Sequence, residues 1–240
     1  MSEPKLYLLD IEGTVAPLTL TTEVLFPYAR AHVARFLHDH ATDEDVRSDL
    51  ALLAGENEAD VDGSRPLFSR ADQIDEALAY LLWLMDRDRK STALKSLQGK
   101  VWKEGFETGA LRGTLFADVR PALERWSVAA KVAIYSSGSV GAQRLLFRYS
   151  NFGDLTHFLS GYFDTRTGPK AEAASYRAIA SDLHVEPAGI LFFSDAVREL
   201  DAARSAGCQT RLVARPGNPA PEEGHGHLRI ESFQQLAVSY

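Results

Sequence analysis

The feature that most constrains the fold is a set of short apolar runs, each of which ends at a turn or at polar residues. The clearest runs are residues 5–9, 131–135, 189–193 and 210–213, and weaker ones are residues 157–163 and 227–230. A short, continuously apolar run bounded by turn residues is typical of a strand that is buried on both faces of a parallel sheet. The runs therefore predict a mainly parallel sheet.

Helical patterns separate the later runs. Apolar residues recur at helical spacing over residues 119–130, 141–149, 171–183 and 198–206. Strands that alternate with helices in this way predict a doubly wound α/β fold. We expect residues 1–18 and 116–240 to form this α/β core.

The alternation is interrupted between residues 19 and 115, where the pattern is helical throughout. The predicted helices are residues 22–40, 43–54, 70–88 and 92–108. Thr42 is placed to cap the second of them, and Gly99 is expected to break or kink the fourth. Residues 57–66 are rich in Gly, Asp and Ser, which predicts a loop. We therefore expect residues 19–115 to form an all-helical cap domain inserted after the first strand.

Charge and composition exclude several classes of protein. The 26 Lys and Arg residues against 33 Asp and Glu residues give a net charge of −7, and no basic stripe suits a nucleic acid. The longest apolar-rich stretch, residues 77–85, is far shorter than the ~20 residues of a membrane helix. Residues 1–4 lack the basic start of a secretory signal, and the single Cys208 cannot form an internal disulfide. We expect a cytoplasmic monomer without nucleic-acid or membrane partners.

Polar residues follow the first two predicted strands, at the strand ends where open α/β sheets bind their ligands. Asp10 and Glu12 follow the first strand, and Gly13 allows a tight turn after them. An aspartate in this position can act as a carboxylate nucleophile, although a strand followed by Asp and a turn is also a common structural pattern. Ser136 and Ser137 follow the second strand, and hydroxyls at a helix N-terminus suit a phosphate group. The structural alternative is that Ser137 or Ser139 only caps the helix.

Two further segments carry a lysine and two acids. Lys170 stands at the start of the predicted helix 171–183, where the helix dipole disfavours a positive charge, so an anionic ligand would explain it. The alternative is a solvated lysine. Asp195 follows the strand 189–193, with Glu199 four residues later. An acid at the end of a buried strand and near a phosphate suggests Mg²⁺, which prefers carboxylate and phosphate oxygens.

These four segments, in this order, resemble the motifs of the haloacid dehalogenase superfamily of phosphohydrolases. The resemblance implies that Asp10 is the nucleophile, that Ser136 supplies the hydroxyl of the second motif, and that Asp195 is the metal-binding acid. Lys170 matches the lysine of the third motif, and Glu199 falls where the family often has a second acid. The inserted helical domain matches the position of the family's cap.

Within that superfamily the chain resembles the enolase-phosphatase family of methionine salvage over nearly its whole length. General superfamily members have Asp where this chain has Glu12. The segments that carry the resemblance are D-I-E-G-T (10–14), I-Y-S-S-G-S (134–139), G-P-K-A-E-A-A-S-Y (168–176), S-D-A-V-R-E-L-D-A-A (194–203), L-Q-G (97–99) and W-K-E-G-F (102–106). The chain departs from the family at Val15 and Ala16, where the family tends to have threonines.

The resemblance implies a two-step reaction on 2,3-diketo-5-methylthiopentyl 1-phosphate. The substrate is enolised and then dephosphorylated to the acireductone. One Mg²⁺ ion would be held by Asp10, Asp195 and Glu12, the last through its backbone carbonyl. Ser136, Ser137 and Lys170 would bind the phosphate, with Asp10, Glu12 and Lys170 as the catalytic residues.

The resemblance leaves two questions open. The enolisation base is Glu12 or one of the cap residues Glu23, Lys103 and Glu104. The runner-up function is a phosphatase of the same superfamily that acts on another small phosphate ester. A catalytically silent binding module is disfavoured, because such a module would be expected to have lost at least one of the catalytic groups.

Overall fold

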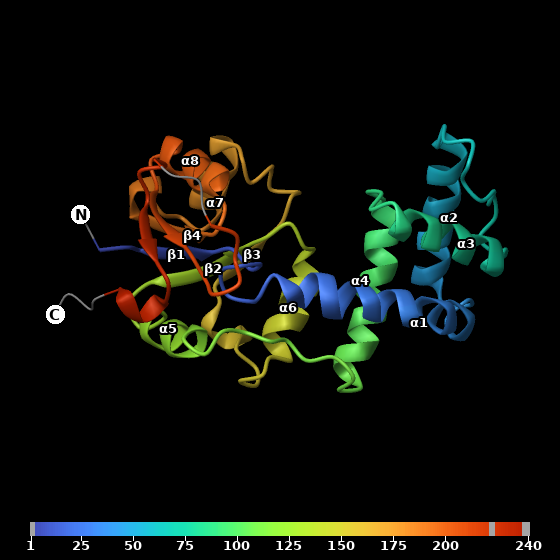
Figure 1. The fold of residues 1–240 in the computed structure, drawn as a ribbon, viewed down its shortest axis with the longest axis horizontal. Helices are drawn as coiled ribbons and strands as arrows, with labels where there is room; N and C mark the ends of the chain where they lie inside the picture. Colours follow the sequence, from blue (N-terminus) through green and yellow to red (C-terminus); the bar gives the residue numbers. More distant parts are fainter. Residues whose placement is uncertain (1–2, 221–223, 237–240) are drawn as a thin grey trace. The chain divides into compact units, whose positions relative to one another are not determined.

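Two compact units make up the structure, a computed structural model that describes residues 3–220 and 224–236. The first unit comprises Met1–Thr21 and Arg112–Tyr240, and the second comprises Thr22–Leu111. Within the described residues, the strands all belong to the first unit, and the second unit is helical (Figure 1). None of the helices in these residues is long and apolar enough to cross a membrane.

The sheet of the first unit has six strands, and every pair of neighbours is parallel. The strands are β1 (Leu6–Leu9), β2 (Lys131–Tyr135), β3 (Gly161–Phe163), β4 (Ile190–Ser194), β5 (Gln209–Val213) and β6 (Leu228–Ile230), in the order β3-β2-β1-β4-β5-β6. This confirms the predicted doubly wound, parallel α/β fold. The weak run 157–163 is a strand only at its end, because residues 156–158 form a 3₁₀ turn.

The register of the sheet aligns the ends of its three central strands. Leu9 is paired with Ile134 of β2 and with Phe193 of β4. Asp10 continues the chain beyond β1, and its amide donates to the carbonyl of Phe193 at 3.0 Å. The residues that follow β1, β2 and β4 therefore emerge at the same edge of the sheet.

Helices cover the two faces of this sheet (Figure 1). They are α5 (Val119–Trp126), α6 (Val140–Arg148), α7 (Ala173–Asp182) and α8 (Val197–Ser205), with 3₁₀ turns at Thr156–Phe158, Pro187–Gly189 and Phe233–Gln235. Leu6, Leu8 and Phe192 pack with α7 and α8 in one buried cluster. On α5, Trp126 stacks on Tyr7 with the ring centroids 4.4 Å apart. Since residues 6 and 8 point opposite to residue 7, α5 lies on the other face.

The second unit has its own buried core. Its α-helices are α1 (Phe26–Asp39), α2 (Glu44–Ala59), α3 (Ile74–Asp86) and α4 (Thr92–Glu107), and a π-helical turn over Leu20–Leu25 spans its boundary with the first unit. Leu37, Leu50, Leu81 and Leu97, one from each α-helix, are fully buried in one cluster. Each helix therefore turns one apolar stripe inward.

Three local predictions for this unit are wrong. The residue that precedes α2 is Asp43, and not Thr42, and it makes no side-chain capping hydrogen bond. Helix α4 runs through Gly99 without a break, since the ~1 kcal/mol cost of a helical glycine is small beside the packing of that helix. Helix α2 continues to Ala59, beyond the start of the predicted loop, because the buried Asn57 amide donates to the carbonyl of Pro66 and anchors the last turn.

Candidate active site

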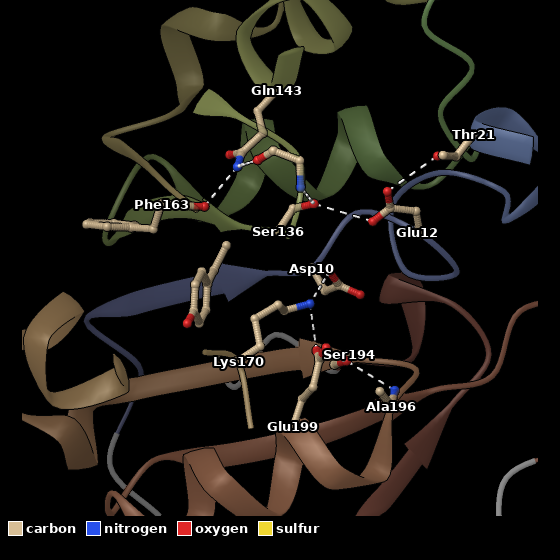
Figure 2. A network of polar contacts seen from close by, with 12 residues as sticks. Asp10, Glu12, Thr21, Ser136, Gln143, Phe163, Lys170, Ser194, Ala196 and Glu199 are labelled. Atoms are coloured by element: carbon tan, nitrogen blue, oxygen red, sulfur yellow. Dashed lines mark hydrogen bonds and ion pairs between the residues drawn. The ribbon is translucent and has the colours of Figure 1, made fainter. Parts of the chain in front are cut away.

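Polar side chains from all four of the predicted segments point toward one another at the carboxyl edge of the sheet (Figure 2). Asp10 follows β1, Ser136 follows β2, and Lys170 lies between β3 and α7. Glu199, on the first turn of α8, extends back to the same place. The carboxyl ends of parallel strands thus gather residues that are up to 189 positions apart in the chain.

A buried ammonium group pairs with two carboxylates at the centre of this cluster. The Lys170 Nζ lies 2.5 Å from Asp10 Oδ1 and 2.6 Å from Glu199 Oε2. The Lys170 side chain is only 10% exposed and that of Asp10 only 5%. Burial alone would lower the pKa of Lys170, but the charges of Asp10 and Glu199 raise it above its ordinary value, so the group stays charged.

The same burial acts on Asp10 in the opposite sense. Desolvation raises the pKa of Asp10 to about 8, against the attraction of Lys170 and together with repulsion from Glu199 and Glu12. The site thus concentrates negative charge around one ammonium group. A group that adds positive charge there would favour the ionised carboxylate.

The backbone that carries Lys170 is held by three hydroxyl groups. Tyr135, Ser175 and Tyr176 donate to the carbonyl oxygens of residues 168, 169 and 170, at 2.8, 2.7 and 2.7 Å. These bonds fix the turn from which the lysine extends.

Lys170 itself precedes the helix rather than belonging to its first turn. Helix α7 begins at Ala173, with Glu172 as its N-cap. The argument from the helix dipole was therefore wrong, although the residue that it selected lies in the site. The two carboxylates that flank the ammonium group explain the charge at this position.

Glu12 faces two hydroxyl groups. Ser136 Oγ donates to Glu12 Oε2 and Thr21 Oγ1 donates to Glu12 Oε1, both at 3.3 Å (Figure 2). These distances are long for an O–H···O bond, so the two hydroxyl groups orient the carboxylate only weakly. Ser136 is almost fully buried and its Oγ also accepts from the amide of Gly138 at 3.2 Å. A half-buried acid with two adjustable partners suits proton transfer.

Asp195 enters the site beside the loop that follows Asp10. A Cβ atom added to Gly13 would lie 2.3 Å from Asp195 Oδ2, and Gly13 has a φ of +70°. Both its conformation and its contact with Asp195 therefore require glycine. Burial raises the pKa of Asp195 to about 6, and the charge of Glu199 adds to this. Ser194 Oγ donates to Glu199 Oε2 at 2.8 Å, which holds Glu199 in the cluster.

The second serine of the predicted pair has a different environment. Ser137 is exposed, and its hydroxyl has no hydrogen-bond partner within the described part of the chain. Ser139 caps α6, which begins at Val140, by accepting from the amide of Ala142. The structural alternative therefore holds for Ser139, while Ser137 stays open to solvent.

Sequence reasoning missed several residues that support the site. Gln143 is buried, and its Nε2 donates to the carbonyls of Gly138 and Phe163, both at 2.8 Å. The sequence signal that could have identified Gln143 is a polar residue on the apolar stripe of the predicted helix 141–149. Thr21 gave no comparable signal, because nothing in its local sequence points to Glu12.

The donor set fits a divalent cation that prefers oxygen. Asp10 and Glu199 contact the Lys170 ammonium group, and the carboxylates of Glu12 and Asp195 lie near enough to raise the pKa of Asp10 or to be influenced by the charge of Lys170. Within the described residues, no group of three or more His, Cys, Asp or Glu side chains is placed to hold a metal ion. The Glu12 side chain is turned toward Ser136. Two aspartates and a backbone carbonyl, completed by phosphate and water oxygens, are a set that Mg²⁺ accepts.

The fold and the cluster at its edge together define a hydrolase of the α/β class. Comparison with known proteins gives the same answer. The family model described as haloacid dehalogenase-like hydrolase matches residues 4–207. The chain therefore belongs to the haloacid dehalogenase-like hydrolases and, within them, to the enolase-phosphatase family, as the following relatives show.

Several curated relatives carry the name Enolase-phosphatase E1. The protein of Synechococcus elongatus is 54% identical over 230 residues, which cover 95% of this chain and 96% of the relative. That of Leptospira borgpetersenii is 44% identical over 233 residues, with 97% and 98% covered. The solved structure of the UTR4 protein from Saccharomyces cerevisiae is 35% identical, has a TM-score of 0.81, and covers 98% of this chain and all of its own. The predicted family and enzyme class are confirmed.

Proposed function

We propose that this enzyme of methionine salvage converts 2,3-diketo-5-methylthiopentyl 1-phosphate to the acireductone 1,2-dihydroxy-3-keto-5-methylthiopentene and inorganic phosphate. The observation that carries the proposal is the buried Asp10, which is bonded to Lys170 and stands beside Glu12 at the edge of the sheet. The name shared by the full-length relatives supports the choice of substrate. Enolisation precedes phosphate removal, since an enolate is a better leaving group than a simple alkoxide.

In the first phosphoryl step, the carboxylate of Asp10 attacks phosphorus. A bond forms between an Asp10 oxygen and phosphorus, and the bond from phosphorus to the enol oxygen breaks. The electron pair leaves with that oxygen, which takes a proton from the Glu12 carboxyl group. In the second step, Glu12 accepts a proton from water, the water oxygen attacks phosphorus, and Asp10 is released as a carboxylate.

The remaining residues bind and orient the phosphate. Lys170 keeps its proton throughout and offsets charge on the phosphoryl oxygens. Ser136 and Ser137 donate hydrogen bonds to the same oxygens, and the exposure of Ser137 leaves its hydroxyl available for this role. Asp10 and Asp195, with the backbone carbonyl of Glu12, would hold one Mg²⁺ ion. Bound there, the ion supplies further charge neutralisation at the phosphoryl group.

Among the four candidates for the enolisation base, ion pairs support Glu12 or Glu23 in that role. Lys103 is paired with Glu107 at 2.7 Å, and Glu104 is paired with Arg35. Both charges are therefore engaged within the second unit. Glu12 and the exposed Glu23 remain, and Glu12 already belongs to the cluster.

We also propose that the enzyme acts as a cytoplasmic monomer, with residues 19–115 as its cap. The net charge of −7 supports the absence of a nucleic-acid partner, and the single cysteine supports a reducing compartment.

One assay tests the function. Purified protein is incubated with the diketo phosphate and Mg²⁺, and ultraviolet absorbance and phosphate are followed together. We expect both signals to rise. Phosphate release without the absorbance of the enediol would point to a phosphatase for another ester.

Two perturbations test the residue roles. Asp10→Asn is expected to abolish phosphate release while the circular dichroism spectrum stays unchanged, because an amide cannot replace the attacking carboxylate. Chelation by EDTA is expected to stop turnover and added Mg²⁺ to restore it. Turnover by the variant would remove Asp10 as the nucleophile, and full activity in EDTA would remove the metal ion.

A further inference from the structure

Within the loop of residues 11–16 that follows Asp10, only some of the backbone carbonyl groups are hydrogen-bonded to other groups of the loop. The amides of Thr14, Val15 and Ala16 all donate to the carbonyl of Ile11, at 2.9–3.1 Å, and the amide of Gly13 donates to Ala16. These internal bonds use the carbonyls of residues 11 and 16. The three carbonyls of residues 13–15 are left for groups from outside the loop.

Each of these three consecutive carbonyls is held by a different donor. Asn218 Nδ2 donates to residue 13 at 2.8 Å, and Arg215 Nε donates to residue 14 at 3.0 Å. The amide of Phe116 donates to residue 15 at 3.0 Å. Two of the three donors are side chains from the segment that follows β5, and neither belongs to the cluster around Asp10.

Arg215 is held through its Nε and Nη1 atoms, while its buried Nη2 has no hydrogen-bond partner within the described residues. Its side chain is 4% exposed, and its Nη1 donates to Asp118 Oδ2 at 2.7 Å and to the carbonyl of Glu231 at 3.1 Å. The rings of Phe116 and Phe233 lie 4.5 and 4.6 Å from its Cζ atom. Burying an ion pair costs desolvation energy that apolar residues of similar volume would avoid, so stability alone is a poor explanation for it. The guanidinium group of Arg215 has a defined position, which suits it to hold a backbone carbonyl in place.

Asn218 holds the same loop as Arg215, and it also lies near the carboxylate of Asp195. A Cβ atom built on Gly13 would be 2.9 Å from Asn218 Nδ2 and 2.3 Å from Asp195 Oδ2. The Asn218 amide and the Asp195 carboxylate therefore both pack against Gly13. Removal of this amide would therefore loosen the backbone at Gly13, which is one residue from Glu12 and three residues from Asp10.

We infer that Arg215 and Asn218 are positioning residues of phosphoryl transfer. By holding the carbonyls of residues 13 and 14, they fix the loop that sets the positions of Asp10 and Glu12. This inference rests on the proposed function. It adds a role for two residues that touch none of the charged groups of the cluster. A displacement of about 1 Å of a reacting group can cost on the order of 10²-fold in rate, so fixing this loop matters for kcat.

The test compares Asn218→Ala with Asn57→Ala. Asn57 makes the same kind of bond, from its Nδ2 to the carbonyl of Pro66 at 2.9 Å, in the second unit. We expect Asn218→Ala to lower kcat about tenfold, as the loss of one hydrogen bond suggests, with KM within about twofold and little change in Tm. Asn57→Ala is expected to lower Tm and to leave kcat unchanged.

Arg215→Lys provides the second variant, because it keeps the buried charge and the protein folded. A lysine lacks the planar fork that serves residue 14 and Asp118 together, so we expect kcat to fall about tenfold or more. Amide hydrogen exchange of residues 13–16, measured by NMR, gives a readout that does not depend on activity. Exchange there should be faster in both variants than in the wild type.

The outcomes separate this inference from the proposed function. Wild-type kcat and wild-type exchange in both Asn218→Ala and Arg215→Lys would overturn the positioning role, even with the diketo phosphate turned over normally. Failure of the wild type to turn over that substrate would overturn the function instead. In that case faster exchange in the variants would still support the fixing of the loop.

Discussion

The substitution Gly13→Ala tests the packing of the two loops that carry Asp10 and Asp195. The added Cβ would lie 2.3 Å from Asp195 Oδ2. An ordinary contact needs about 3.5 Å, so the carboxylate must retreat by roughly 1 Å. A shift of that size in a catalytic group lowers kcat on the order of 10²-fold. Because Asp195 is a proposed metal ligand, the Mg²⁺ concentration for half-maximal activity should rise as well.

The stability cost has two parts. Alanine at a φ of +70° is strained by about 1–2 kcal/mol, of which a part is offset by the lower entropy of its unfolded chain. The overlap with Asp195 adds about 1–3 kcal/mol. We therefore expect a total loss of about 2–4 kcal/mol in the free energy of unfolding, measured by urea denaturation.

Gly153→Ala is the matched control in the same unit. Gly153 has a φ of +83°, but a Cβ there would meet nothing within 4 Å. It should lose about 1 kcal/mol from strain alone and keep its kcat. Equal losses in the two variants, with kcat retained in Gly13→Ala, would refute the argument from the Asp195 contact.

Three further predictions follow from buried charges and the buried thiol. Lys170→Met leaves the two carboxylates beside it without a cation, so it should cost about 3–5 kcal/mol in urea denaturation and at least about 10²-fold in kcat; wild-type values would place that lysine in solvent. Burial raises the pKa of Asp118, but the hydrogen bond and the charge of Arg215 have the larger combined effect and hold this pKa below its ordinary value. Its contribution to stability is therefore complete above about pH 4 and is lost as the pH falls through the lower folded pKa. Urea denaturation of Asp118→Asn should show a shallower acid decline than the wild type, and an identical decline would contradict this. Burial raises the pKa of the Cys208 thiol to about 12, so a thiol reagent at pH 8 should label the unfolded chain only, which a rapid reaction with the folded protein would disprove.

The sheet and the edge at which its polar residues gather were predictable for a physical reason. A strand buried on both faces must be apolar along its whole length, so β2 was located at its true bounds, 131–135. Parallel strands all end at the same edge, so polar residues after three of them had to lie close together. The ion pair of Asp10 with Lys170 was not predicted, because Lys170 was expected to meet an anionic ligand or solvent.

The wrong predictions, and a second ion pair that was not predicted, depend on contacts that no local pattern contains. Thr42 has the chemistry of a helix cap, but the chain enters α2 one residue later. Gly99 has the propensity of a helix breaker, but Leu97 and Val101, both buried, hold α4 together around it. The ion pair of Arg215 with Asp118 joins residues 97 positions apart, and neither neighbourhood marks the other. Tertiary packing decided each of these cases.

The place where the chain leaves the sheet has an evolutionary consequence. In the described residues, every strand pairing joins segments outside residues 22–111. We therefore expect that mutations, lengthening or exchange of that insert can accumulate without shifting the register that aligns the ends of β1, β2 and β4.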